Sequence, residues 1–180
     1  MAEATRGVLR ENGLGGLETL VVQPSGMIGP WDDGANHLVD LIDRARRHRM
    51  PAAVPGGYDV VDVRDVATAV VAAADGGAAG RTYLLSGRWA EVREILGEVR
   101  ALRGGRAPLV LPTALARGVL PAVRTLSRIT ASRPLFTSYA LDTLSAPALF
   151  SHERAAVELG FSPRPLAESV RDTVEWLERR

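Results

Sequence analysis

The residues able to do chemistry are few, and their types exclude several reactions. The sequence has no cysteine, and all 22 of its basic residues are arginine. These 180 residues therefore contain no thiolate nucleophile, thiolate metal site, P-loop lysine or Schiff-base lysine. The three histidines, His37, His48 and His152, are widely separated and have no carboxylate at metal-ligand spacing. We expect no metal site.

Motifs that could support hydrolysis or dinucleotide binding also fail. Ser25 follows an apolar run, but Gln23 stands where the Gly-x-Ser-x-Gly nucleophile elbow needs glycine. The glycine-rich segment 13–16 lacks the third glycine of the dinucleotide fingerprint and precedes an expected strand instead of following one. No tyrosine is followed four residues later by lysine. We therefore expect no catalytic residue of these types within the sequence.

Three aspartates and two aromatic residues are the remaining candidates for a site. Asp59, Asp62 and Asp65 could act as general bases, but strand alternation and a helix-capping position explain at least two of them. We favour a structural role for these carboxylates. Tyr58 and Trp31 are expected on loops near strand ends, where aromatic rings either line a pocket or cover the core. The residues alone leave both readings open.

The overall composition predicts a single globular domain. The formal net charge is +1, with 46% hydrophobic and 24% charged residues, which argues against nucleic acid as the main partner. A run of arginines over 44–49 is interpreted as the solvated end of a helix rather than a phosphate site. The longest apolar stretch, 66–74, is too short to cross a bilayer. Without cysteine or the apolar core of a signal peptide, we expect a cytoplasmic protein without membrane contact.

The elements that must position any site alternate between helices and strands. Residues 19–23 form a β-branched, apolar run ended by Pro24, as expected for a strand buried on both faces of a parallel sheet. The Pro- and Gly-rich segment 24–30 then lies at the carboxyl end of that strand, where open α/β sheets bind their ligands. This segment is the first candidate for a binding site.

The rest of the chain continues the alternation and then becomes mostly helical. We expect strands at 60–63 and 82–85, and helices at 2–12, 36–49, 66–74, 92–102, 151–160 and 166–177, with short helices within 106–145. Three of these helices have an expected N-terminal cap: Asn36, Asp65 and Ser151. Gly104 and Gly160 are expected to end the helices that they follow. This order predicts an α/β fold with helices against a mainly parallel sheet.

Four segments, in order, resemble one family. They are 20–30 (LVVQPSGMIGP), 61–67 (VDVRDVA), 80–87 (GRTYLLSG), and 158–166 (ELGFSPRPL) followed by 172–176 (DTVEW). Together they resemble the extended short-chain dehydrogenase/reductases, also called the NAD-dependent epimerase/dehydratase family. The likeness is strongest to dihydroflavonol-reductase-like and sugar-epimerase-like members.

The resemblance implies a fold, a cofactor and a set of contacts. It implies the last strands of a Rossmann-type parallel sheet in 1–105 and an interleaved, mostly helical substrate-binding lobe in 106–180. The cofactor would be NAD or NADP. The implied contacts are Pro24, Ser25, Gly26 and Met27 for the cofactor, and Trp31, His37 and Tyr58 for the substrate. Tyr58 stands near the position where nucleotide-sugar members have an arginine for a substrate phosphate, which argues against a nucleotide sugar.

The resemblance also implies that the catalytic pair lies elsewhere. In the family, a helix often beginning Ala-Glu-Ala follows the Tyr-x-x-x-Lys pair, and here Ala2-Glu3-Ala4 follows Met1 directly. The cofactor loop, tyrosine and lysine would then precede this chain. We therefore expect a truncated, carboxyl-terminal, substrate-binding portion of an NAD(P)-dependent oxidoreductase or epimerase, inactive by itself.

Two alternatives remain open. One is a stand-alone, non-catalytic protein that binds a small molecule or another subunit, and the other is a non-functional remnant. In each case the apolar strand at 19–23 needs cover, so we expect a homo-oligomer, a partner chain over the exposed sheet, or marginal folding.

Overall fold

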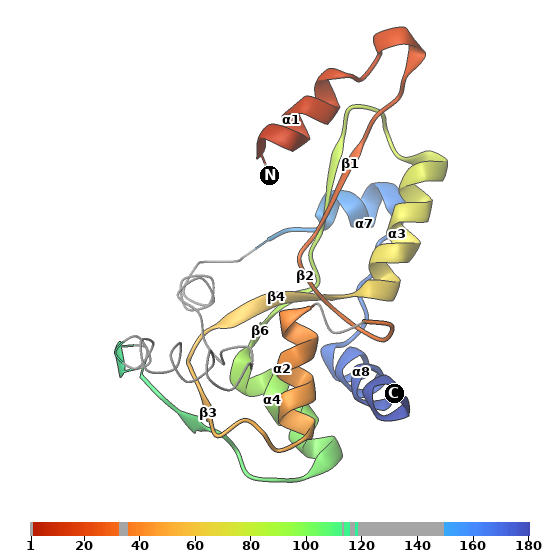
Figure 1. The fold of residues 1–180 in the computed structure, drawn as a ribbon. Helices are drawn as coiled ribbons and strands as arrows, with labels where there is room; N and C mark the ends of the chain where they lie inside the picture. The colour runs from red at the N-terminus through yellow and green to blue at the C-terminus, as the bar shows by residue number, and fades with distance from the viewer. Residues whose placement is uncertain (1, 33–35, 113, 116–117, 119–149) are drawn as a thin grey trace.

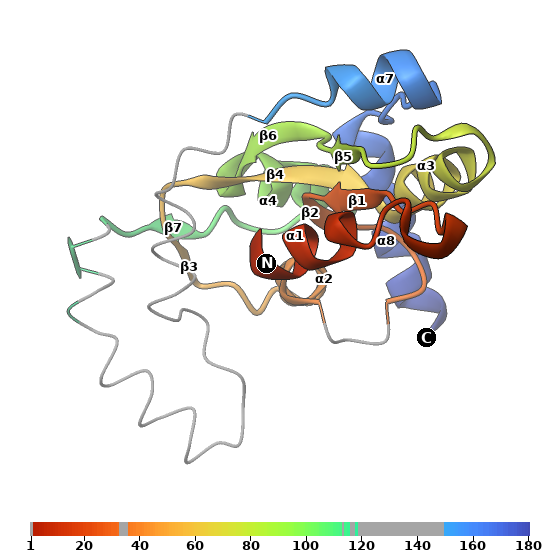
Figure 2. The same cartoon turned by 90° about the horizontal axis from the view of Figure 1, so that it is seen from above.

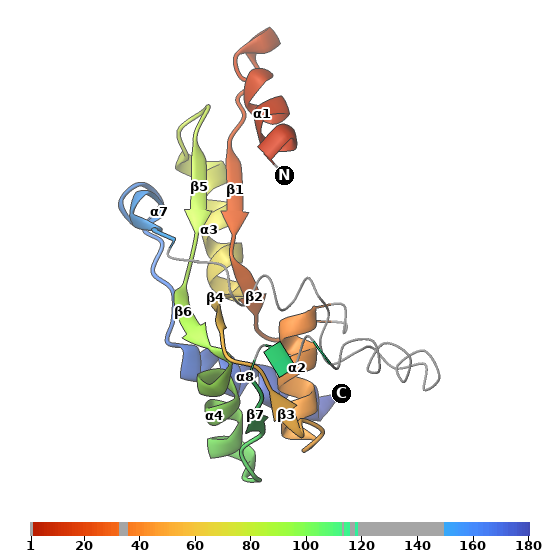
Figure 3. The same cartoon turned by 90° about the vertical axis from the view of Figure 1, so that its left-hand side faces the viewer.

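Two strands run side by side and then separate around a third. The computed structural model describes residues 2–32, 36–112, 114–115, 118 and 150–180. Strands β1 (Val21–Pro24) and β5 (Thr82–Leu85) are parallel neighbours. Their continuations, β2 (Gly26–Ile28) and β6 (Arg88–Glu91), flank β4 (Gly57–Asp62), which is parallel to β2 and antiparallel to β6 (Figures 1 and 3). A short parallel pair, β3 (Ala52–Ala53) and β7 (Leu109–Val110), lies beyond β4.

The helices form two groups around these strands. Their bounds are α1 Ala2–Arg10, the short 3-10 helix η1 Leu14–Gly16, α2 His37–Arg46, α3 Val63–Gly76, α4 Val92–Arg103, α7 Glu153–Leu159 and α8 Leu166–Arg179. Helices α2, α4 and α8 pack on one another and against β2, β4 and β6 (Figures 1 and 2). Helices α3 and α7 pack with β1 and β5. Each group has its own apolar core, with Ile28, Ile42 and Val170 in the first and Tyr83 and Leu85 in the second.

Most predicted elements are confirmed. The structure is an α/β fold with parallel strand pairs, and β5 has the predicted bounds. Asn36 caps α2, because its Oδ1 accepts a hydrogen bond from the Leu38 amide at 2.9 Å. Gly104 ends α4, and Gly160, with φ 67°, ends α7. The short helices expected over 106–145 fall mostly outside the described residues.

Several predicted boundaries were wrong, among them that of the strand at 19–23, which is β1 Val21–Pro24, and that of the helix at 36–49, which ends at Arg46. The strand expected at 60–63 begins at Gly57, so Tyr58 lies within β4 and not on a loop. Asp65 does not cap α3; Asp62 does, since its Oδ1 accepts a hydrogen bond from the Arg64 amide at 2.9 Å. The capping role therefore belongs to the aspartate one turn earlier. Asp65 instead pairs with Arg164 in the segment before α8.

The expected burial of the first strand was also wrong. All of β1 is half-buried or exposed, and in the described part of the chain it pairs with β5 alone. Helix α1 lies along it, where Gln23 Nε2 donates a hydrogen bond to Thr5 Oγ1 at 3.1 Å. An apolar strand with one open edge keeps exposed surface, which explains the incomplete burial.

A network of charged side chains joins β4 and α3 to α8. The Asp62 carboxylate is fully buried and lies 2.8 Å from Arg64 Nη2, whose Nη1 lies 2.7 Å from Asp172 Oδ2. Burial alone would raise the pKa of Asp62, but hydrogen bonds from Arg64 and Ser169 and the Arg64 charge together hold it below its usual value. The pKa of Asp172 is lowered in the same way, against burial, by hydrogen bonds from Arg64 and Arg171.

We expect these carboxylates to make folding acid-sensitive. Since their folded-state pKa values lie below those of the unfolded chain, their stabilisation is present above about pH 4 and is lost as the pH falls through the folded values. Urea unfolding midpoints should therefore fall as the pH is lowered from about 5 to about 3. Asp172→Asn should reduce the drop in the unfolding midpoint between these two pH values. A drop equal to that of the parent protein would contradict the lowered pKa of Asp172.

Candidate functional site

The candidate site lies where β1 and β5 stop pairing. The Ser25 amide donates a hydrogen bond to Leu85 O at 3.1 Å, and then β4 enters between the separated strands. Asp59 of β4 binds the chain that follows β5, because its carboxylate accepts hydrogen bonds from Ser86 Oγ at 2.7 Å and from the Gly87 amide at 3.1 Å. The entry of β4 thus fixes residues 24–27 at the carboxyl end of β1. We call them loop 24–27 after the sequence prediction, although Pro24 belongs to β1 and Gly26 and Met27 belong to β2, so that only Ser25 lies outside a strand.

Gly26 has a packing role in loop 24–27. An added Cβ would lie 2.8 Å from Leu38 Cδ1 and 2.9 Å from the Asp59 carbonyl oxygen. The protein's own atoms occupy that space, so the glycine is needed for the loop to approach β4 and α2 closely. Gly26 thus lets the segment approach β4 and α2 closely.

Ser25 carries an unsatisfied polar atom. Its Oγ is buried and has no hydrogen-bond partner among the described residues. A buried hydroxyl without a partner costs about 1–3 kcal/mol, which folded proteins seldom tolerate without a reason. The residues of loop 24–27 fit the nicotinamide end of a dinucleotide in this respect, because a carboxamide offers both a donor and an acceptor to a hydroxyl.

Asn36 joins loop 24–27 to the start of α2. Its Nδ2 donates a hydrogen bond to Met27 O at 2.7 Å while its Oδ1 caps the helix. The next residue, His37, packs edge-on against Tyr58 with ring centroids 5.5 Å apart. Two of the three predicted substrate residues are therefore in contact and are linked to the loop through Asn36.

Trp31 is placed differently. Its side chain is 70% exposed, and its φ of 71° is unusual for a large residue. In the described part of the chain, no ring contact joins it to His37 or Tyr58. The structure thus presents Trp31 as an exposed ring after loop 24–27, held in a strained backbone conformation.

The His37–Tyr58 pair is electrically neutral near pH 7. Burial lowers the pKa of His37, against the opposing effect of the Asp40 charge. Burial raises the pKa of Tyr58. Both shifts favour the uncharged form, so this surface suits a neutral or aromatic group better than a phosphate.

Two contacts at the candidate site were not predicted from the sequence. The Asn36 cap was predicted, but its second bond, to Met27, depends on how α2 meets the loop. Asp59 was expected to be structural, which is confirmed, but its partners Ser86 and Gly87 follow a different strand. The only signal for them was Ser-Gly directly after an apolar strand.

Metal-binding clusters and membrane-spanning helices are both absent from the described residues. These residues contain no group of three or more His, Cys, Asp or Glu side chains arranged to hold a metal ion. Each helix in the described ranges is too short or too polar to cross a bilayer.

Comparisons with known proteins identify the relatives. No family model matches the chain. Sterol demethylase protein B of Methylococcus capsulatus is 30% identical over 168 residues, which cover 92% of this chain and 51% of that protein. A Synechocystis protein of the dihydroflavonol 4-reductase type is 27% identical, over 91% of this chain and 49% of its own length. The crystal structure of gox2253 matches with a TM-score of 0.77 at 28% identity, covering 98% of this chain and 54% of that one.

The resemblance to the extended short-chain dehydrogenase/reductases is confirmed. The chain spans about half the length of the curated relatives that it matches. Solved structures with the same fold include a nucleoside-diphosphate-sugar epimerase and an NADPH complex, at 24% and 18% identity. Those two likenesses bear on the fold alone.

Proposed function

We propose that the chain is the substrate-binding portion of an NAD(P)-dependent reductase or epimerase. In this function, loop 24–27 lies against the nicotinamide end of the cofactor, and Trp31, His37 and Tyr58 contact the substrate. The observation that carries the proposal is the buried, unpartnered Ser25 Oγ at the carboxyl end of β1. The similarity to reductase-type relatives supports it.

In this function, the residues of this chain bind and orient the cofactor and the substrate. The nicotinamide would donate or accept the hydride. Loop 24–27 and the Ser25 hydroxyl would fix the ring, while Asn36 holds the loop against α2. Proton transfer in this family is the work of a Tyr-x-x-x-Lys pair, which these 180 residues do not contain. Activity therefore requires that pair from further polypeptide, in the same chain or in a partner, and β1 offers an open edge for it.

We propose a neutral, ring-containing alcohol or ketone as the substrate. By the family resemblance, Tyr58 stands near the position of the phosphate-binding arginine of nucleotide-sugar members. Burial also favours the uncharged forms of both His37 and Tyr58. The names of the relatives, a sterol demethylase protein and a dihydroflavonol 4-reductase, are in keeping with such a substrate. Cysteine-free composition supports a cytoplasmic location.

Ser25→Ala tests the role of the loop. We expect the substitution to weaken NADH or NADPH binding by the native protein about fivefold to tenfold, because one hydrogen bond is lost. The thermal midpoint should stay equal or rise, since a buried unpaired hydroxyl is removed. Nicotinamide fluorescence titration measures the affinity.

The matched control is Ser162→Ala, at an exposed serine outside the site. Its cofactor affinity should equal that of the parent protein. If the parent protein and Ser25→Ala bind the cofactor with equal affinity, the Ser25 hydroxyl does not contact it. A native protein that folds and binds no nicotinamide cofactor would instead favour the stand-alone binding protein.

A further inference from the structure

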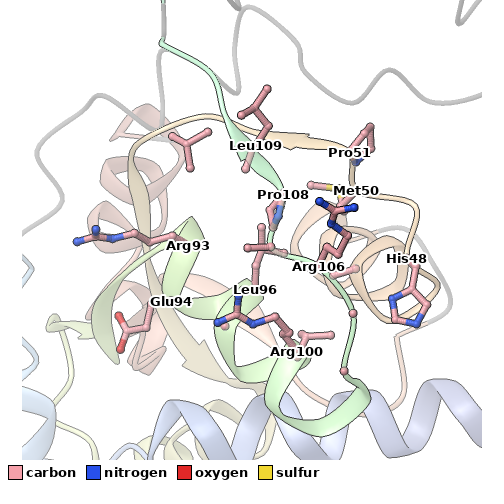
Figure 4. Close-up of a pocket in the computed structure, with 18 of the residues that line it drawn as sticks. His48, Met50, Pro51, Arg93, Glu94, Leu96, Arg100, Arg106, Pro108 and Leu109 are labelled. Atoms are coloured by element: carbon pink, nitrogen blue, oxygen red, sulfur yellow. The ribbon is translucent and has the colours of Figure 1, made fainter.

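A cavity lies between α4 and the segment that leads into β7. Its volume is 1230 Å³, which is large enough for a ligand with a substantial hydrocarbon body. Much of its lining is apolar: Ala45, Met50, Ala53, Leu96, Val99 and Leu109. Figure 4 shows Leu96 on α4 facing the same space as Pro108 and Leu109 of the opposite wall. We call this cavity the α4 groove.

The charged residues around the α4 groove leave a positive excess. Arg93 pairs with Glu91, and Glu94 pairs with Arg88. Arg100 of α4 and Arg106 of the opposite wall also line the groove, and neither forms an ion pair within the described ranges (Figure 4). Both residues are exposed. Two guanidinium groups on opposite walls of an apolar groove thus lack an anion.

The apolar lining and the two arginines together favour a ligand with a hydrocarbon body and an anionic group. A guanidinium is weakly hydrated and binds a carboxylate through two parallel hydrogen bonds, which suits it to the border between apolar surface and water. An apolar lining favours a hydrocarbon body by removing it from water. We propose that the α4 groove binds a small organic acid, with its hydrocarbon chain on the Leu96 side and its carboxylate between Arg100 and Arg106.

This proposal stands apart from the proposed function. None of the residues that line the groove belongs to loop 24–27, and neither His37 nor Tyr58 is among them. Its test therefore needs no nicotinamide.

The test is displacement of Nile red from the native protein by dodecanoate, dodecanol and acetate. Dodecanoate should displace the dye with saturation, and acetate, which lacks the hydrocarbon body, should not. Arg100→Gln and Arg106→Gln should each weaken dodecanoate about fivefold to tenfold, as expected for one charge-assisted contact, and leave dodecanol unchanged. Arg103→Gln is the control on the same helix, because Arg103 pairs with Glu178 at 2.8 Å and does not line the groove.

A second variant narrows the groove without disturbing the fold. Gly97 lines the groove from α4, and an added Cβ there meets no atom within 4 Å. Gly97→Leu should weaken dodecanoate binding, whereas Gly7→Leu, at a helical glycine in α1 with equally open surroundings, should not. The proposal is overturned if dodecanoate shows no saturable binding. It is also overturned if Gly97→Leu binds dodecanoate like the parent protein, or if Arg103→Gln weakens binding as much as Arg100→Gln.

Discussion

Gly87→Ala is expected to prevent the chain from folding. An alanine Cβ at this position would lie 1.9 Å from the Val60 carbonyl oxygen and 2.8 Å from its carbonyl carbon. Both atoms belong to the backbone of β4, the central strand, which is held on either side by β2 and β6. Relief of the clash requires the strands to separate and breaks the bond from the Gly87 amide to Asp59. We expect a loss of more than about 4 kcal/mol, comparable with the whole stability of a marginal domain.

The control for this prediction is another glycine with free space. Gly97 lies within α4, and an added Cβ meets nothing within 4 Å. Gly97→Ala should therefore stabilise the protein by about 0.5–1 kcal/mol, through helix propensity. Soluble yield and urea unfolding of the two variants provide the measurement. A Gly87→Ala protein with the parent's unfolding midpoint would show that the strands do not meet as described.

Arg64→Met is expected to cost about 3–5 kcal/mol of unfolding free energy. Arg64 is the main partner of the fully buried Asp62 carboxylate, and the substitution leaves that charge without its closest cation. Arg164 Nε, 3.8 Å from Asp62 Oδ2, compensates only in part. The bond between Arg64 and Asp172 is lost as well, so α8 loses a link to the start of α3. Urea unfolding at pH 7 measures the loss.

A double variant separates the buried charge from the lost contacts. Asp62→Asn combined with Arg64→Met removes the charge and retains a good helix cap, so it should be more stable than Arg64→Met alone. Arg88→Gln breaks the exposed pair with Glu94 and should cost less than about 1 kcal/mol. Similar losses of unfolding free energy for Arg64→Met and Arg88→Gln would contradict the claim that the cost of Arg64→Met arises from the buried Asp62 charge.

Local signals in the sequence were sufficient for several elements. The apolar run 82–85 became β5 without change, and Gly104 ended α4, because strand burial and helix termination depend on neighbouring residues. The position of loop 24–27 was predicted for the same reason: Pro24 ends an apolar strand. In the described part of the chain, the fold class and the end of β1 at Pro24 could thus be predicted from the sequence.

Long-range pairing could not be predicted in the same way. Arg64 and Asp172 are 108 residues apart, and nothing local indicates that they meet. Strand β2 has only three residues and exists because β4 enters beside it, so the sequence indicated a loop. Likewise, the contact between His37 and Tyr58 results from the approach of α2 to β4.

The most direct test of the central claim is made on the native protein from its source cells. An antibody against α8 would capture it, and native mass spectrometry with nicotinamide analysis would define its polypeptides and bound nucleotide. We expect a species that includes a Tyr-x-x-x-Lys sequence, in the same or an associated polypeptide, and that binds NAD or NADP. A lone 19.2 kDa chain that binds neither nucleotide would contradict the proposed function.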